Sequence, residues 1–349
     1  MTIDRPTLAD FTYLSAGIAS KMHRMMYDYG PGNGTFLGLP FDQLVEHGPG
    51  HEFKWDRCAK PASVIELANT GPFSAVVLSV GQAIKYQHDI EIPLLIKLDG
   101  HFTTGKVNDA NYPRHTMFGS VEEAVEAGAD GVGLSFYLGS QQTGEDVERI
   151  GKIRKEAHDA GLPLVLWCYP RGPLPSATKA DSLLWCHYAV SAGESLGADI
   201  IKTKFPSVVP PKQRDAYEDF ILNEYAPRLP EVVHYLDLEP SREQLEEYQA
   251  NLPKGEKPNY DSLLTKEQHI ERAKIVTGAA TRTVVIYSGG PKVTGDAKAA
   301  LTESTEVIME AGGEGRIIGR NFWGVPIEEG LDLANAVAEI MKQEKYRRN

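Results

Sequence analysis

The sequence predicts an α/β protein, a (β/α)8 or TIM barrel formed as a single domain by residues 1–349, and three features support this class. Eight short apolar segments recur along the 349 residues, helix-like segments lie between most of them, and several of those end in Ala-Gly or Leu-Gly. Strands that alternate with helices pair in parallel, and eight such units close a barrel. An open doubly wound sheet is the alternative, but no Gly-x-Gly-x-x-Gly follows the first predicted strand.

The predicted strands are short, apolar and rich in β-branched residues, as expected for strands buried on both faces. They cover residues 35–41, 74–79, 93–98, 131–136, 163–169, 198–203, 283–287 and 315–318. The predicted helices include residues 20–29, 63–69, 121–127, 145–160 and 180–196. Gly128, Gly161 and Gly197 follow three of these helices and fit C-terminal caps.

One connection, residues 205–282, is much longer than a barrel loop requires. Prolines interrupt its first part, and Ser241 with Gln244 has the spacing of a capping box that opens a helix through Gln249. We expect this segment to be an insertion between strands six and seven on the active face, and to act as a lid rather than as a second domain.

Composition restricts the class of partner. A formal net charge of -12 argues against a nucleic-acid partner, whose backbone is bound mainly by lysine and arginine. The three cysteines form no CxxC pair, which suits a reducing compartment. Residues 1–35 contain charged side chains and no long apolar run, so neither a signal peptide nor a membrane span is expected. These features together predict a cytoplasmic protein.

The sixth predicted strand ends in two lysines, Lys202 and Lys204. An amine held among apolar walls beside a second cation loses proton affinity and can condense with a carbonyl group. The alternative is that both side chains extend along the strand end and place their ammonium groups in water. Sequence alone does not decide which of the two lysines would form an imine.

Glycines and an arginine follow the last two strands. Ser288, Gly289 and Gly290 offer backbone N–H groups that no bulky side chain shields, and Gly319 with Arg320 adds a cation after the next strand. The loops after strands seven and eight of such barrels commonly bind phosphate. A simple turn is the alternative for the Ser-Gly-Gly segment alone, but the pair of segments favours a phosphate site.

Two further polar residues follow strands at the same end of the barrel. Asp42 follows the first strand and can exchange protons, and Tyr169 ends the fifth and can act as an acid or base. Helix capping by Asp42 and burial of Tyr169 as a hydrogen-bonded core residue are the structural alternatives. Trp167 and Tyr169 alternate along their strand, so both can face the barrel interior while Cys168 points outward as a packing residue.

A divalent metal site is a less favoured hypothesis. Candidate ligands occur after the first and third strands: Glu46, His47, His51, Glu52, Asp99 and His101. However, Gly48, Pro49 and Gly50 break the helical spacing that would place His47 and His51 on one face. His47 is then either a contact to a substrate hydroxyl or a structural loop residue.

Together these segments resemble the class I fructose-bisphosphate aldolase family of the archaeal and bacterial type, from about Phe36 onward. The resemblance rests on motifs in the same order: FDQLVEHGP, LIKLDG, WCYPRG, GADIIKTK, and SGGPK with IIGRNFW. It implies a Schiff-base lyase on a (β/α)8 barrel that acts on a phosphorylated sugar in glycolysis and gluconeogenesis, needs no metal or other cofactor, and forms a homo-oligomer.

The resemblance also implies roles for individual residues. Lys202 would form the imine, Tyr169 would transfer the proton for cleavage of the C3–C4 bond, and Asp42 would assist carbinolamine breakdown. Trp167, His47 and Arg171 would shape the sugar site, and the phosphate would be bound by Ser288, Gly289, Gly290, Gly319 and Arg320.

Two departures from the family pattern affect the mouth of the site. Phe205, Pro206 and the two residues after them replace the usual Tyr-Thr-Gly-Asp, and Asp99 stands where relatives often have asparagine. Substrate identity is therefore less firmly implied than imine chemistry. A related Schiff-base transaldolase or thiolase acting on another ketose phosphate, and a non-catalytic barrel that binds a phosphorylated metabolite, are the alternative functions.

Overall fold

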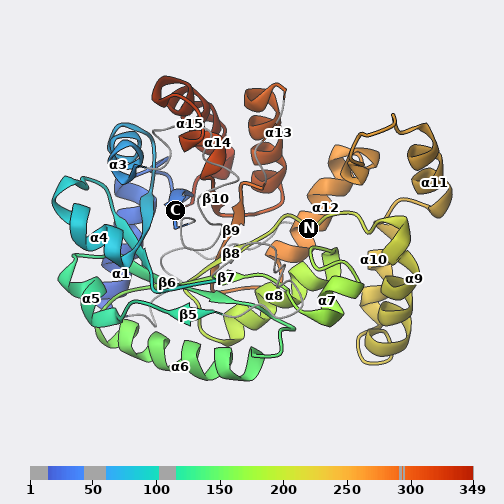
Figure 1. The fold of residues 1–349 in the computed structure, drawn as a ribbon, viewed down its shortest axis with the longest axis horizontal. Coiled ribbons are helices and arrows are strands. Elements are labelled where there is room, and N and C mark those ends of the chain that lie inside the picture. Colours follow the sequence, from blue (N-terminus) through green and yellow to red (C-terminus); the bar gives the residue numbers. More distant parts are fainter. Residues whose placement is uncertain (1–14, 43–59, 102–114, 291–292, 294, 349) are drawn as a thin grey trace.

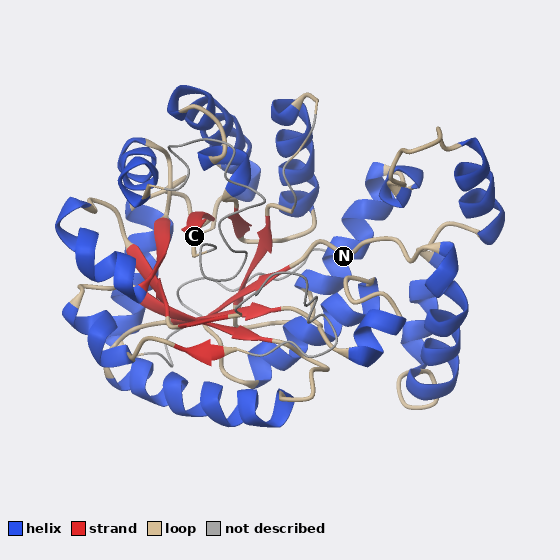
Figure 2. Cartoon of the chain, in the orientation of Figure 1, coloured by secondary structure: helices blue, strands red, loops and turns tan. Residues whose placement is uncertain are grey.

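The chain folds as a closed barrel of eight parallel strands surrounded by helices (Figures 1 and 2). The computed structural model describes residues 15–42, 60–101, 115–290, 293 and 295–348. Neighbouring strands around the barrel follow the order β1-β10-β9-β8-β7-β6-β3-β2. The predicted (β/α)8 class is confirmed.

Each of the eight predicted strands has a counterpart in the barrel, with ends that differ by at most two residues. The barrel strands are β1 Phe36–Phe41, β2 Ala75–Ser79, β3 Leu94–Lys97, β6 Gly131–Phe136, β7 Leu164–Cys168, β8 Ile200–Thr203, β9 Val284–Ser288 and β10 Gly315–Ile317. Two short strands outside the barrel, β4 Asp99–Gly100 and β5 Thr116–Met117, pair antiparallel and were not predicted.

Helices surround the barrel, and most of them connect consecutive strands. They are α3 Pro61–Thr70, α4 Val80–Tyr86, η4 Gln87–Asp89, α5 Val121–Glu126, α6 Thr143–Asp159, α7 Pro173–Ala177, α8 Leu183–Ser195, α12 Lys266–Thr277, α13 Ala297–Glu310, α14 Arg320–Trp323, α15 Ile327–Met341 and η9 Glu344–Tyr346. Gly128, Gly161 and Gly197 have φ angles of 73°, 73° and 82°, so they take the left-handed conformation that ends a helix.

The predicted N-terminal helix starts earlier than expected, at α1 Ala16–His23, and continues as η2 Arg24–Asp28. Its apolar side, including Met22 and Met25, joins the same hydrophobic cluster as interior barrel residues such as Val165 and Ile200. Two ion pairs hold this segment to Asp130, from Lys21 at 3.0 Å and from Arg24 at 2.5 Å. The N-terminal segment therefore packs against the barrel interior.

The long connection after β8 contains extra elements and one regular barrel helix. The extra elements are α9 Pro211–Asp219, η6 Phe220–Tyr225, η7 Pro230–Val233, α10 His234–Asp237, α11 Arg242–Asn251 and η8 Tyr260–Leu263. Ser241 and Gln244 form the predicted capping box at the start of α11. Helix α12 packs between α8 and α13 in the outer ring, so the extra elements lie within residues 204–265 rather than 205–282.

A buried ion pair attaches the insertion to the barrel. Arg272 of α12 is 0% exposed, and its Nη1 donates to Oε1 of Glu239 at 2.8 Å. The other guanidinium nitrogen, Nη2, donates to the Ser207 carbonyl at 3.0 Å. Glu239 also accepts a hydrogen bond from the backbone N–H of Val209. Since these groups are paired where water is excluded, the insertion is held at a defined position near the end of β8.

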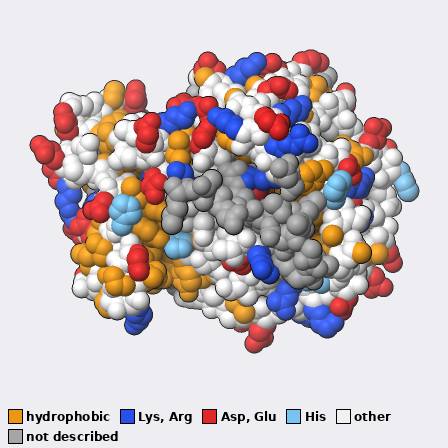
Figure 3. All heavy atoms as spheres, turned by 180° about the vertical axis from the view of Figure 1, so that it is seen from behind, with side chains coloured by type: hydrophobic (Ala, Val, Ile, Leu, Met, Phe, Trp, Pro, Cys, Tyr) orange, Lys and Arg blue, Asp and Glu red, His pale blue; other side chains and the backbone are white. Residues whose placement is uncertain are grey.

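Exposed apolar side chains gather on the surface of this part of the molecule. Figure 3 shows hydrophobic side chains on the side that carries the insertion. Five of the eight large exposed hydrophobic residues among those described come from α7, α8 and the insertion: Leu174, Tyr188, Leu222, Leu229 and Val233. Among the described residues, no helix combines the length and the apolar character needed to cross a membrane.

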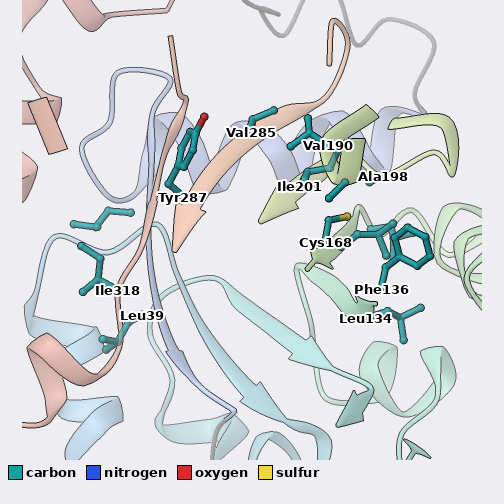
Figure 4. Close-up of a cluster of buried hydrophobic side chains, with 14 of the residues drawn as sticks. Leu39, Leu134, Phe136, Cys168, Val190, Ala198, Ile201, Val285, Tyr287 and Ile318 are labelled. Atoms are coloured by element: carbon teal, nitrogen blue, oxygen red, sulfur yellow. The ribbon is translucent and has the colours of Figure 1, made fainter. Parts of the chain in front are cut away.

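A hydrophobic layer between the strands and the outer helices completes the core (Figure 4). Ile201 and Cys168 belong to this layer together with Val190 of α8, whereas Trp167 belongs to the cluster inside the barrel. Alternating residues of one strand thus face opposite sides, as expected. Burial raises the pKa of the Cys168 thiol, so its position and its chemistry agree with a packing role.

Candidate active site

A cavity of about 500 Å³ opens where the barrel strands end. Ten of the eleven predicted site residues line it: Asp42, Trp167, Tyr169, Arg171, Lys202, Ser288, Gly289, Gly290, Gly319 and Arg320. The eleventh, His47, lies outside the described residues, as do Glu46, His51 and Glu52. Phe205, Ser207 and Asp261 add a wall from the connection after β8. Segments far apart in the sequence therefore converge on one hollow.

Lys202 occupies the barrel interior at the end of β8. Its residue is 8% exposed, and its Nζ lies 5.2 Å from the ring centroid of Trp167 and 6.0 Å from that of Tyr169. In the sheet it pairs with Trp167 of β7 on one side and Ile286 of β9 on the other. The amine thus faces the cavity from an environment of aromatic rings.

Lys204 faces the same cavity but has an acidic partner. Its Nζ donates to Oδ2 of Asp181 at 2.8 Å, and Arg171 lies 3.2 Å from the other carboxylate oxygen. Burial lowers the pKa of Lys204, while the charge of Asp181 opposes that change. Burial alone would raise the pKa of Asp181, but Lys204 and Arg171 outweigh it and hold the pKa at about 2. Lys204 therefore lies in an ion pair with Asp181 at the cavity, although burial still lowers the pKa of its amine.

Trp167 fills the space between the strands below the cavity. A Cβ atom at Gly133 of β6 would lie 2.1 Å from the Trp167 ring, so only glycine at that position leaves room for the indole. The Trp167 residue is 2% exposed, and its Nε1–H has no hydrogen-bond partner among the described residues. Since a buried donor normally has a partner, this N–H is suited to donate to a bound substrate.

Tyr169 lies among cations just after β7. The centroid of its ring is 5.5 Å from the Arg171 guanidinium, 5.8 Å from Lys204 Nζ and 6.0 Å from Lys202 Nζ. Its backbone N–H donates to the Phe136 carbonyl, which extends the pairing of β7 with β6 past the strand end. The phenol is therefore held beside the amine in a positively charged part of the cavity.

The predicted phosphate segments meet beside Lys202, after β9 and β10, the next two strands around the barrel. Gly290 has a φ of 69°, which favours glycine, and its carbonyl accepts a hydrogen bond from Arg320 Nη2 at 3.3 Å. Gly319 packs so closely that a Cβ atom there would lie 2.8 Å from the Pro40 carbonyl oxygen and from Trp323 Nε1. Tight turns rich in glycine, with an arginine beside them, make a concave surface suited to an anion.

Asp99 and His101, two of the candidate metal ligands, do not join this cavity. The Asp99 carboxylate accepts hydrogen bonds from the Ser135 backbone N–H at 3.0 Å and from Arg149 Nη1 at 2.6 Å. It therefore connects β4 to β6 and α6. Within the described parts of the chain, no group of three or more His, Cys, Asp or Glu residues is arranged to hold a metal ion.

Sequence reasoning assigned no role to three residues near this site. Asp181 and Tyr137 line the cavity, and Lys97 lies behind it with its Nζ 3.6 Å from Oδ2 of Asp42. Tyr137 directly follows the strand 131–136, and Lys97 ends its strand, so strand position was an available signal for both. Asp181 lies in a loop before α8 and had no such signal.

A closed parallel barrel with a buried lysine amine, a neighbouring phenol and an anion-binding wall at the strand ends defines a Schiff-base aldolase. A sequence profile of the DeoC/LacD family aldolases matches residues 36–324. The chain belongs to this DeoC/LacD aldolase family and is a lyase.

Curated relatives and solved structures agree with this assignment. A probable class 1 fructose-bisphosphate aldolase of Chlamydia muridarum is 28% identical over 91% of this chain and 82% of its own length. The class 1 fructose-bisphosphate aldolase of Thermoproteus tenax is 27% identical over 88% of this chain and 90% of its own. An archaeal fructose-1,6-bisphosphate aldolase, solved with its catalytic lysine bound to the carbinolamine intermediate, is 25% identical over 92% of this chain and 99% of its own, with a TM-score of 0.66.

Proposed function

We propose that this protein cleaves fructose 1,6-bisphosphate reversibly into dihydroxyacetone phosphate and glyceraldehyde 3-phosphate, as a class I aldolase of glycolysis and gluconeogenesis. The observation that supports this function best is the position of the Lys202 amine, inside the barrel and in the same cavity as Tyr169 and the glycine-rich anion wall.

The reaction begins when Lys202 Nζ attacks the C2 carbonyl carbon. As the amine attacks, the C2 oxygen takes up a proton from solvent and becomes a hydroxyl, while Asp42 accepts a proton from the attacking nitrogen. Asp42 then gives this proton to the C2 hydroxyl, which leaves as water while the nitrogen lone pair forms the C=N bond of the iminium. The resulting iminium withdraws electrons, as a metal ion would in another type of aldolase. The ketose is thereby activated through a covalent bond to the protein.

Cleavage then requires a base at the C4 hydroxyl. The Tyr169 phenolate takes this proton, the C4–O bond becomes a carbonyl, and the electrons of the C3–C4 bond move into the iminium to form an enamine. The cations around the Tyr169 ring, Arg171, Lys204 and Lys202, favour negative charge at this position. Protonation of the enamine at C3 and hydrolysis of the imine release dihydroxyacetone phosphate.

The cavity lining holds two groups that suit anions, one after β9 and β10 and one formed by residues after β7 and β8, which fits a bisphosphate. We assign the C1 phosphate to Ser288, Gly289, Gly290, Gly319 and Arg320, and the sugar hydroxyls to Trp167, His47 and Arg171. Arg171 and Lys204 together form the second cationic end. A phosphate at C6 would either displace the Asp181 carboxylate from Arg171 and Lys204 or share these two cations with it, because both groups are anions.

Borohydride trapping tests the covalent step. Protein incubated with dihydroxyacetone phosphate and reduced with borohydride should carry one adduct, located on Lys202 by peptide mass spectrometry. An adduct on Lys204 would reassign the imine, and no adduct would reject the mechanism. Assays over a panel of ketose phosphates separate the proposed substrate from that of a related transaldolase or thiolase, since turnover of another ketose alone would reject fructose 1,6-bisphosphate.

We also propose that the protein is a single barrel domain whose insertion borders the active face, and that it forms a cytoplasmic homo-oligomer. The wall made by Phe205, Ser207 and Asp261 supports the first point. The exposed apolar residues of α8 and the insertion support self-association. Light scattering of the purified protein gives the oligomer mass directly, and a monomer at micromolar concentration would contradict this part of the proposal.

A further inference from the structure

Lys97 is a deeply buried lysine that the mechanism above does not use. It ends β3 and is 1% exposed, which places it among the largest fully buried side chains of the described residues. Lysine is almost never fully buried unless it is paired, because removing an ammonium group from water is costly. The position therefore calls for a specific interaction.

One such interaction is with Asp42. The Lys97 Nζ lies 3.6 Å from Oδ2 of Asp42, whose residue is itself only 6% exposed. Asp42 lines the cavity, whereas Lys97 is not part of its lining. The lysine consequently contacts the carboxylate from the side away from the substrate, where it can influence the charge and orientation of Asp42 without contacting the reacting atoms.

Lys97 also shares a contact with the imine-forming lysine. The Nζ atoms of Lys97 and Lys202 lie 5.4 Å and 5.2 Å from the centroid of the same Trp167 ring. Strands β3 and β8 are not neighbours, because β6 and β7 lie between them in the barrel. Trp167 bridges this gap, so Asp42, Lys97, Trp167 and Lys202 form one chain of contacts across the barrel interior.

We propose that Lys97 is a positioning residue that holds the Asp42 carboxylate ionised and oriented for formation and dehydration of the carbinolamine on Lys202. This inference rests on the proposed function. With the Lys97 ammonium beside it, Asp42 is ready to accept the proton that Lys202 Nζ releases during attack on C2. The C2 oxygen takes its first proton from solvent and becomes a hydroxyl. The proton held by Asp42 then goes to this hydroxyl, which leaves as water, and the carboxylate is restored.

A double-mutant cycle tests whether Lys97 acts through Asp42. The four proteins are the wild type, Lys97→Met, Asp42→Asn and the double variant, each assayed for kcat and KM of cleavage and for the rate of borohydride-trapped adduct on Lys202. We expect Lys97→Met to lower kcat and the trapping rate about 100-fold, the low end of acid–base effects. KM should change by less than about 3-fold, since Lys97 is not part of the cavity lining.

In the Asp42→Asn background, Lys97→Met should lower kcat and the trapping rate less than about 3-fold, because the effects of residues that act as one unit are not additive. An equal loss in both backgrounds, or full activity of Lys97→Met, overturns the inference. If Lys97→Met alone fails to fold because the buried Asp42 carboxylate loses this ion pair, the double variant removes both charges and is compared directly with Asp42→Asn. If kcat or the trapping rate of the double variant is well over 3-fold below that of Asp42→Asn, the inference is also overturned.

The wild-type arm separates this inference from the function on which it rests. A wild-type protein that gives no trapped adduct and no cleavage rejects the aldolase mechanism itself. A wild-type protein that gives both, together with a Lys97→Met variant of equal trapping rate, rejects only the role assigned to Lys97.

Discussion

Two lysines near the end of one strand, Lys202 in β8 and Lys204 just after it, show how surroundings decide the chemistry of identical side chains. Lys202 and Lys204 are two residues apart, and both line the same cavity. Lys202 lies among the rings of Trp167 and Tyr169 inside the barrel, whereas Lys204 at the rim is 2.8 Å from the Asp181 carboxylate. The interior location suits a nucleophile, and the rim location suits a fixed positive charge that binds an anion.

Removing each lysine in turn gives the sharpest contrast between the two locations. Lys202→Met should lower kcat by at least about 10⁴-fold, because no other amine replaces the covalent step. Trapping with borohydride should then give no adduct. Lys204→Met is the matched control and should still form the adduct on Lys202. An adduct trapped on Lys204 in the Lys202→Met variant would show that Lys204, rather than Lys202, forms the imine.

Replacing Tyr169, whose ring lies near both Lys202 and Lys204, should have the next largest effect on activity. Tyr169→Phe removes the proposed base, so cleavage should slow by about 10²- to 10⁴-fold. The imine with dihydroxyacetone phosphate should still form, because Tyr169 acts after it. Tyr137→Phe, which changes the other phenol of the cavity lining, should slow cleavage less than about 10-fold. Similar losses in both variants would mean that neither phenol is a specific base.

Removing positive charge from the rim should affect binding more than turnover. Lys204→Met should raise KM for fructose 1,6-bisphosphate about 10- to 100-fold, as for loss of a charge-assisted hydrogen bond. Cleavage of fructose 1-phosphate, which lacks the C6 phosphate, should change by less than about 3-fold in kcat/KM. Lys204→Arg keeps the charge and should retain most of the preference for the bisphosphate. Equal losses on both substrates would argue against a C6 phosphate contact at the rim.

The packing of the interior can be tested without changing any charge. Gly133→Ala places a methyl group against the Trp167 ring, and overpacking of this kind typically costs about 1–3 kcal/mol of unfolding free energy. Gly151→Ala in α6 is the matched control, since no atom lies within 4 Å of the added Cβ there. It should be neutral or slightly stabilising. Urea unfolding measures both variants, and equal stability would show that Trp167 can move without cost.

Much of the barrel could be predicted because its signals are local. Every barrel strand corresponds to an apolar segment visible in the sequence, and the glycines after α5, α6 and α8 mark helix ends by their need for positive φ. Strand-end positions and the family resemblance then named ten of the cavity residues, because parallel strands place those ends together. The boundary between α12 and the insertion was less predictable, since helix propensity does not show which surface a helix covers.

By itself, the sequence determined the eight-stranded class, the order of the site segments and the pair of lysines from which a nucleophile could be chosen. Only the tertiary structure decided that Asp181 pairs with Lys204, that Lys97 lies behind Asp42, and that Gly133 makes room for Trp167. The physical reason is that hydrophobic periodicity is set by neighbours along the chain. Electrostatic partners and steric limits, in contrast, depend on residues brought together only when the barrel closes.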